Sequence, residues 1–442
     1  MNLDPVILGL LGIVVLFILL AVGVHIGVAL GVVGITGSAL LVGFEGSVYP
    51  SVSSMYHKVA SFDLITIPLF VLMGYLASGG GISQKTFEAL NAWVGRLRGG
   101  LGISTVFSCT AFGAVCGSSM VTAAVFARLC APEMRKLGYD KRLAYGICSS
   151  AGMIGMLIPP SILAVVYAVM AGESTGKLLI AGITPGLLLM VLFSAVILMI
   201  GWARPDSLKP VQAEGRISWR RKFRLLGQVW QVLLVAALIF GGIFGGVFNP
   251  TEAAAVATVA LLVLLTVSKW GTSWPLFREA FRETCSTSAM IFLVMGSASI
   301  FSQFLVLTGI SEKIVEFVIS AQLSRISFVC LVIVVYLILG CLLDSISMLC
   351  ITIPLFNPII KQMGIDPIWY AVIVIMSIEA GLVTPPVGLN VYATYAVAEK
   401  DTTLEDIFSG VFPFLFATFL SIVILMVIPS LSTFLPEMML GK

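Results

Sequence analysis

The sequence predicts an all-α integral membrane protein: a multi-spanning helical bundle with two inverted-topology repeats, each with a re-entrant hairpin and a broken helix. Its 442 residues are 59% hydrophobic and only 11% charged, and the mean hydropathy of +1.09 is far above that of soluble domains. Charge-free runs at 5–23, 27–44 and 178–202 each approach the roughly 20 apolar residues that a helix needs to cross the hydrocarbon core. Sequence similarity between the two halves is the third observation.

Hydropathy divides the chain into two sets of membrane segments. The first set is predicted at residues 5–23, 25–44, 60–78, 102–130, 143–171 and 178–202. The second set is predicted at residues 229–248, 252–268, 284–307, 326–360, 368–397 and 408–436. Residues 1–203 therefore form the first repeat and residues 229–442 the second. Between them, residues 204–228 are rich in Lys and Arg, which predicts a cytoplasmic connector.

The charges also predict how the segments cross the membrane. If residues 102–130 form a hairpin that leaves the membrane by the side it entered, the basic residues on both of its flanks lie on the cytoplasmic side, which is also the predicted side of the connector. The same reasoning makes residues 326–360 a second hairpin that opens to the outside, and it puts both termini outside. An alternative is that each hairpin is an ordinary pair of short helices that barely reach the midplane.

The two halves are related in sequence at one fixed offset. Pro159-Pro160 and Pro385-Pro386 lie 226 positions apart, and the same offset matches five further pairs without a gap: Gly155 with Gly381, Asp140 with Asp366, Gly138 with Gly364, Pro132 with Pro358 and Ser119 with Ser345. A duplicated unit accounts for these matches. Because the matched hairpins open to opposite sides, the repeats have inverted topology, which is typical of alternating-access transporters.

Four polar or proline-containing interruptions break the apolar segments. They are the hairpin tips at 113–124 and 340–347 and the helix breaks at 155–161 and 381–390, called here the first and second break. Lipid provides no water for unpaired backbone groups, so such interruptions are tolerated only inside protein or along a cavity. The residue before a proline avoids the helical region and the proline cannot donate to the preceding turn, which predicts free carbonyls at Ile158 and Thr384.

Free carbonyls, hydroxyls and one carboxylate form the oxygen-rich set that Na⁺ requires, and half-helix N-termini suit an anionic substrate. Predicted cation site 1 consists of Ser118, Ser119, Gly155, Ile158 and Pro159. Predicted cation site 2 consists of Gly340, Asp344, Ser345, Thr384 and Pro385. No intramembrane Arg or Lys is evident for a substrate carboxylate, so the predicted substrate-binding residues are Ser161, Gly388 and Asn390. No metal ion or cofactor other than Na⁺, as the coupling ion, is predicted.

Each of these residues also has a purely structural interpretation. The Pro-Pro pairs alone would favour simple helix kinks, although their symmetric pairing with hairpins favours binding sites. Ser118 and Ser119 are small enough to serve close helix packing. An acid in an apolar stretch usually marks an ion pathway, yet Asp344 can instead cap a half-helix. Glu379 is consistent with either a gate or a solvated face.

At these residues the sequence resembles the large membrane subunit of tripartite ATP-independent periplasmic (TRAP) transporters, of the C4-dicarboxylate and sialic acid type. The matching motifs run over nearly the whole chain and are IPLFVLMG (67–74), RGGLGISTVF (98–107), the GSS tip (117–119), APEM with GYDKRLA (131–144), LIPPS (157–161), AGITPG (181–186), GCLLD (340–344) and TPPVGLNVY (384–392). One departure is Met120, where the resemblance leads us to expect a small residue.

The resemblance implies a sodium-driven secondary transporter of the elevator type in the bacterial inner membrane, with the hairpins and broken helices as the moving domain. It implies a small four-helix membrane subunit and a soluble periplasmic binding protein as partners. The binding protein would deliver a small organic acid, whose identity the sequence does not specify.

Other classes of function have less support. No nucleotide-binding loop of the G-x-x-x-x-G-K-[ST] type occurs, and no basic run interleaved with aromatics favours nucleic acid. An intramembrane enzyme would need paired catalytic groups, and Asp344 and Glu379 have no repeat-related acid opposite them. A self-sufficient carrier of organic anions remains an alternative, as does a cation channel, although an inverted repeat within one chain favours a carrier.

Overall fold

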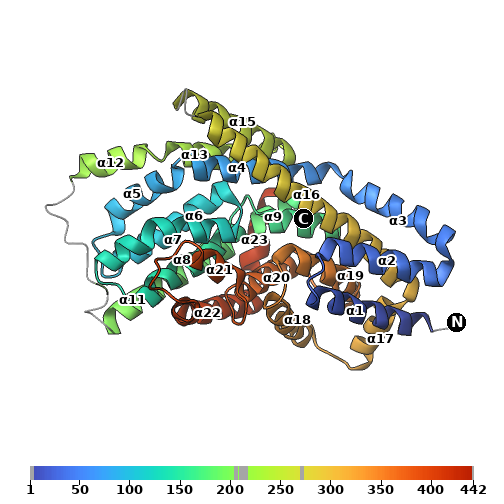
Figure 1. The fold of residues 1–442 in the computed structure, drawn as a ribbon. Helices are drawn as coiled ribbons and strands as arrows, with labels where there is room; N and C mark the ends of the chain where they lie inside the picture. Colours follow the sequence, from blue (N-terminus) through green and yellow to red (C-terminus); the bar gives the residue numbers. More distant parts are fainter. Residues whose placement is uncertain (1–3, 204–207, 209–217, 269–272, 441–442) are drawn as a thin grey trace.

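The computed structural model describes residues 4–203, 208, 218–268 and 273–440, and every regular element among them is helical (Figure 1). The first half contains α1 (Pro5–Ala21), α2 (Ile26–Val42), α3 (Phe44–Val59), η1 (Phe62–Ile65), α4 (Thr66–Gly79), α5 (Ile82–Val94), α6 (Gly100–Cys116), α7 (Ser119–Lys136), α8 (Lys141–Leu157), α9 (Ile162–Ala171), α10 (Thr175–Ala181) and α11 (Ile183–Ala203). The second half contains α12 (Trp219–Gly227), α13 (Trp230–Ala236), η2 (Ala237–Gly241), α14 (Gly242–Phe244), α15 (Pro250–Ser268), α16 (Ser273–Thr308), α17 (Ile310–Ser320), α18 (Arg325–Gly340), α19 (Ser345–Met363), α20 (Pro367–Gly381), α21 (Leu389–Tyr395), α22 (Leu404–Val427) and α23 (Ser430–Leu440).

The helices confirm the predicted fold class of a multi-spanning helical membrane protein. Within the described residues, six helical stretches are long and apolar enough to cross a membrane, or eight if each bent pair counts as one span. Other predicted segments correspond to apolar helices of 10–17 residues, among them α1 and α2. About half of the Leu10, Val14 and Ile18 side chains on α1 is exposed, which suits a helix face toward lipid. The predicted sidedness of the termini and hairpins stays a prediction.

Several helices differ from the segments that hydropathy predicts. Helix α16 has 36 residues and begins well before the predicted segment 284–307, because its first turns carry Arg278, Glu279 and Arg282. Helices α3, α5 and α17 lie between predicted segments, and α12 contains the last part of the predicted connector. Residues 204–207 and 209–217 of that connector lie outside the described residues. Hydropathy detects apolar runs, so it misses mixed-polarity helices and the charged ends of long ones.

Each half contains a tight helical hairpin followed by a bent helix pair. In the first hairpin, α6 ends at Gly117, whose φ of 66° is left-handed, and Ser118 caps α7 by accepting a hydrogen bond from the Val121 N–H. In the second hairpin, α18 leads through residues 341–344 to α19, which Asp344 caps. The first broken helix consists of α8 and α9, which meet at an angle of 44°, and the second consists of α20 and α21, which residues 382–388 separate.

The same close backbone approach recurs in both halves. A Cβ atom on Gly113 would lie 2.5 Å from the Gly155 Cα, and a Cβ atom on Gly340 would lie 2.6 Å from the Gly381 Cα. Only glycine permits such a crossing between hairpin and broken helix. Asp140 and Asp366, one pair of the sequence repeat, likewise have the same task, since each caps the helix that leads to its break.

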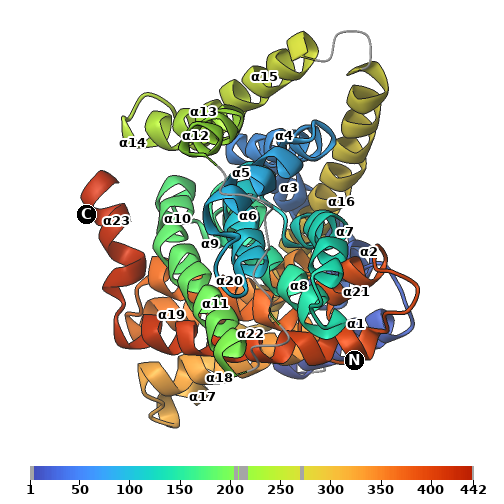
Figure 2. The same ribbon diagram turned by 90° about the vertical axis from the view of Figure 1, so that its left-hand side faces the viewer.

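The broken helices exchange partners between the halves. Helix α8 packs against both helices of the first hairpin, while its continuation α9 packs against α19 of the second. Helix α20 packs against α18, while its continuation α21 packs against α7 and α8, as Figures 1 and 2 show. The two hairpins and the two broken helices are therefore one interlocked group, here called the core group.

Charged groups link the two halves at one end of the core group. Lys141 and Arg142 both form ion pairs with Asp406, at 2.6 and 3.2 Å. Arg135 pairs with Asp401 at 2.6 Å and also with Glu399. The hydrogen bond from the Arg135 guanidinium holds the pKa of the exposed Asp401 carboxyl below its ordinary value. These ion pairs connect the end of α7 and the start of α8 to the loop that follows α21 and to the first turn of α22.

Candidate functional site

The tip of the first hairpin lies against the first break. A Cβ atom on Gly117 would lie 2.5 Å from the Pro160 carbonyl oxygen, and one on Gly152 would lie 2.7 Å from the Ser119 carbonyl oxygen. Ile158 has the extended conformation expected of a residue before proline, with ψ of 129°. The hairpin tip, with Ser118 and Ser119, and the break, with the other three members of predicted cation site 1, are thus in direct backbone contact.

The oxygens of this region divide into engaged and free groups. The Ser118 hydroxyl caps α7, and its carbonyl accepts a hydrogen bond from the Thr122 hydroxyl at 2.8 Å. Among the described residues, no backbone N–H donates to the carbonyl oxygens of Ile158 or Thr384. Both breaks therefore keep the unpaired oxygen atoms that a cation site needs.

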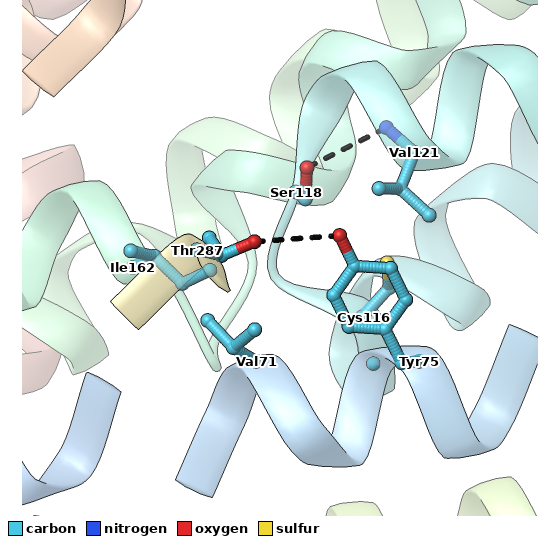
Figure 3. A pocket seen from close by; sticks show the side chains of 8 residues that line it. Val71, Tyr75, Cys116, Ser118, Val121, Ile162 and Thr287 are labelled. Carbon is cyan, nitrogen blue, oxygen red and sulfur yellow. Dashed lines mark hydrogen bonds between the residues drawn. The ribbon is translucent and has the colours of Figure 1, made fainter. Parts of the chain in front are cut away.

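A small cavity of about 50 Å³ separates this tip from the surrounding helices (Figure 3). The first hairpin and the first broken helix contribute Cys116, Ser118, Val121 and Ile162 to its lining, α4 contributes Val71, Gly74 and Tyr75, and α16 contributes Thr287. The hydroxyls of Tyr75 and Thr287 lie 3.5 Å apart, within hydrogen-bond distance of each other. The Met120 side chain, at the position where a small residue was expected, is 41% exposed and is not among the residues that line this cavity.

The second tip and break form a more open region. Asp344 accepts hydrogen bonds from the backbone N–H groups of Ile346 and Ser347, so the capping interpretation of this acid is correct, whether or not it also binds a cation. The Cys341 thiol donates to the Pro385 carbonyl oxygen at 3.1 Å, which joins tip and break. Thr384 is half-buried and donates to its own helix at Ala380. A cavity of about 370 Å³ lies between Asp344 and the turn from α1 to α2.

The three predicted substrate residues are all buried in the breaks. Ser161 caps α9 by accepting from the Ala164 N–H at 3.1 Å. Gly388 has a left-handed φ of 64° and lies against the Phe408 ring. Asn390 is 0% exposed, and neither atom of its amide has a hydrogen-bond partner within the part of the chain that the structure describes.

Glu379, which sequence reasoning left undecided, is only 1% exposed, which excludes a solvated face. Its Oε1 accepts a hydrogen bond from the Ser119 hydroxyl at 3.2 Å, and its side chain lies next to that of Asn390. Its Oε2 has no hydrogen-bond partner among the described residues. The only signal in the sequence was an acid two positions before a break, and its partner Ser119 lies 260 positions away.

A basic cavity was also missed by the sequence analysis. It has a volume of about 600 Å³ and lies between α3, α9, α16 and α19. Its polar lining includes Ser54, His57, Lys58, Ser302, Gln303 and Asn357, and no carboxylate. The Lys58 ammonium donates to the Val169 carbonyl at the end of α9, at 2.7 Å. The sequence analysis did not consider Lys58, because this residue lies on a helix that hydropathy did not predict.

Comparison with known proteins decides the family. Residues 13–431 match the family model described as the tripartite ATP-independent periplasmic transporter, DctM component. The chain belongs to this TRAP transporter family. The C4-dicarboxylate TRAP transporter large permease protein DctM of Pseudomonas aeruginosa is 34% identical over 91% of this chain and 93% of its own length.

Relatives with other named substrates match over similar lengths. The ectoine/5-hydroxyectoine large permease UehC of Ruegeria pomeroyi is 30% identical over 97% of this chain and 98% of its own. The sialic acid large permease SiaM of Vibrio cholerae is 29% identical over 88% and 89%. The solved YdaH transporter of Alcanivorax borkumensis has the same fold, with a TM-score of 0.64, 15% identity and 98% coverage of both chains. The chain is thus a TRAP large permease, a multi-pass inner-membrane transport protein and not an enzyme.

Proposed function

We propose that this TRAP permease imports a small organic acid anion together with Na⁺, and that no other cofactor takes part. The observation that carries the proposal is the pair of matched tip-and-break contacts, each with nearby hydroxyls and a backbone carbonyl that accepts no backbone hydrogen bond among the described residues. Neutral oxygens and a single carboxylate suit a weakly held, hard cation such as Na⁺. Site 1 comprises the first tip and break, and site 2 the second, as the sequence predicted.

The substrate class follows from the relatives and from the charge of the cavities. Named relatives transport C4-dicarboxylates, sialic acid and ectoine. Lys58 and His57 give the largest of these cavities a positive or neutral lining without carboxylates, which suits an anion on its way to the breaks. Ser161, Gly388 and Asn390 are the proposed substrate-binding residues, because they lie at or next to the N-termini of the half-helices α9 and α21.

An elevator movement of the core group is the proposed mechanism. The interlocked packing of hairpins with both broken helices favours their movement as one body. The other helices, including α1, α2, α4, α15 and α16, would form the scaffold. The proposed partners are a small four-helix membrane subunit and a periplasmic binding protein. A relative named as permease protein DctMQ matches this chain over only 64% of its length, which leaves room there for a second component.

Transport in reconstituted vesicles tests the proposal. The chain, its small membrane subunit and its binding protein are reconstituted, and a gradient of Na⁺, of H⁺ or of neither is imposed without ATP. Uptake of a labelled C4-dicarboxylate is expected only with the Na⁺ gradient. Equal uptake under all three conditions would contradict ion coupling. Saturable, Na⁺-driven uptake by the chain alone would establish a self-sufficient carrier instead.

A further inference from the structure

Glu379 is a buried acid without a charged partner. It is 1% exposed, and in the described part of the chain it forms no ion pair with Lys, Arg or His. The Ser119 hydroxyl donates to its Oε1, the Asn390 side chain lies beside it, and its Oε2 has no hydrogen-bond partner among the residues that the structure describes. An isolated carboxylate at membrane depth is costly unless a positive charge accompanies it, so this position is suited to bind a cation.

The repeat shows which site is missing an acid. Cation site 2 has its own carboxylate, Asp344, but the residue 226 positions earlier in site 1 is Ser118. Site 1 thus consists of neutral groups within its own repeat. The equivalents of Glu379 and Asn390 in the first repeat are Met153 and Ala164, so the second repeat carries a carboxylate and an amide where the first has apolar side chains.

The packing of the core group brings these extra groups to site 1. Ser119 belongs to the first tip, whereas Glu379 lies on α20 and Asn390 on α21, which packs against α7. Asn390 is 0% exposed, and its amide oxygen has no partner, like the Glu379 Oε2. The side chains of Ser119, Glu379 and Asn390, on three different helices, therefore meet in a buried region, and one of them is an acid.

We propose that Glu379, with Ser119 and Asn390, supplies the negative charge of cation site 1 and binds its Na⁺ across the two repeats. This rests on the proposed function, because it assumes that site 1 binds a coupling ion. Its consequence is that a single Na⁺ would link the first hairpin to α20 and α21. The same ion would orient Asn390, a proposed substrate residue, so that cation and substrate binding are connected through one amide.

The variant Glu379→Gln tests the proposal in the reconstituted complex. Glutamine keeps the shape and the acceptor for Ser119 but removes the charge. The half-saturating Na⁺ concentration for uptake should rise by about ten- to a hundredfold, the range expected for losing an interaction with a charged group. Na⁺-induced thermal stabilisation of the detergent-solubilised complex, which does not depend on transport, should weaken in parallel. Glu88→Gln, the same change at an exposed carboxylate, should alter neither value.

Further variants keep the test decisive if Glu379→Gln does not fold. Glu379→Asp retains the charge, so uptake should still depend on Na⁺, with a reduced Na⁺ affinity. Ser119→Ala should reduce Na⁺ affinity without other effects on uptake. An unchanged Na⁺ requirement in all the variants that fold would overturn the inference and leave the proposed function standing. The inference would also be overturned if Glu379→Gln shifted the pH profile of uptake without changing Na⁺ affinity, because the Glu379 carboxyl would then bind a proton and not Na⁺. Na⁺-independent uptake by the unmodified complex would instead reject the proposed function.

Discussion

Replacing Asp344 by asparagine or alanine separates its two roles. The carboxylate accepts hydrogen bonds from the backbone N–H groups of Ile346 and Ser347, at 3.1 and 3.2 Å, and also from the Ser347 hydroxyl. Asparagine keeps a side-chain oxygen for the cap but has no charge, whereas alanine removes both. The two variants therefore share the loss of charge and differ in the loss of the cap.

The expected magnitudes follow from this difference. Asparagine is as good an N-cap as aspartate, so Asp344→Asn should cost only the interaction of the charge with the helix end, about 0.3–1 kcal/mol. Asp344→Ala should cost a further 1 kcal/mol or so, the typical value for a lost cap. If Asp344 is part of cation site 2, both variants should raise the half-saturating Na⁺ concentration about tenfold or more.

Two measurements on the same preparations distinguish the roles. Thermal unfolding in detergent reports the cap, and Na⁺-dependent uptake in vesicles reports the cation site. Stability should fall mainly in the alanine variant, and Na⁺ affinity should fall equally in both. If Asp344→Asn leaves the Na⁺ dependence unchanged and only lowers stability, the aspartate is a structural cap and its place in cation site 2 is wrong.

Three further predictions follow from the packing, the charge and the proposed movement. Gly113→Ala should destabilise the protein by about 1–3 kcal/mol in thermal unfolding, because the new Cβ would meet backbone atoms. Gly227→Ala is the control, since no atom lies within 4 Å of its Cβ position, and it should leave stability unchanged. If the two variants are equally stable, the close crossing at Gly113 is wrong. Lys58→Gln should raise the KM for a dicarboxylate about tenfold without changing Na⁺ affinity, whereas the exposed Lys85→Gln should change neither; an unaltered KM would remove Lys58 from the substrate path. Single cysteines at Ser119 and Ser345, in a background without native cysteines, should change their labelling by impermeant thiol reagents together when Na⁺ and substrate are added; a change at one position alone would indicate local gating.

Features that depend on local sequence were predictable. Charge-free runs located most of the membrane helices, and the Pro-Pro pairs located both breaks, where Ile158 has the extended backbone that a following proline requires. Asp140 and Asp366 were matched as a pair of the repeat, and both cap a helix. These features follow from the chemistry of a few neighbouring residues, so a single sequence contains them.

Features that depend on contacts between distant segments were not predictable. The role considered for Glu379 depends on its hydrogen bond from Ser119, and that of Lys58 on the contact of its ammonium with the end of α9. Helix α3, which carries Lys58, is of mixed polarity and was therefore invisible to hydropathy. Long-range pairing of this kind is set by how the two halves interlock, and a hydrophobic pattern does not encode that arrangement.

The departures from the repeat are where the two halves differ in chemistry. Duplication accounts for the paired hairpins, breaks and glycine crossings. A duplicated backbone with identical side chains would produce two equivalent sites. Here the second repeat has Asp344, Glu379 and Asn390 where the first has Ser118, Met153 and Ala164. Because Glu379 on α20 accepts a hydrogen bond from Ser119 and α21 packs against α7, Glu379 and Asn390 lie beside the hairpin of the other repeat. This packing distributes the acids of one repeat between both sites, so that each proposed cation site has one carboxylate.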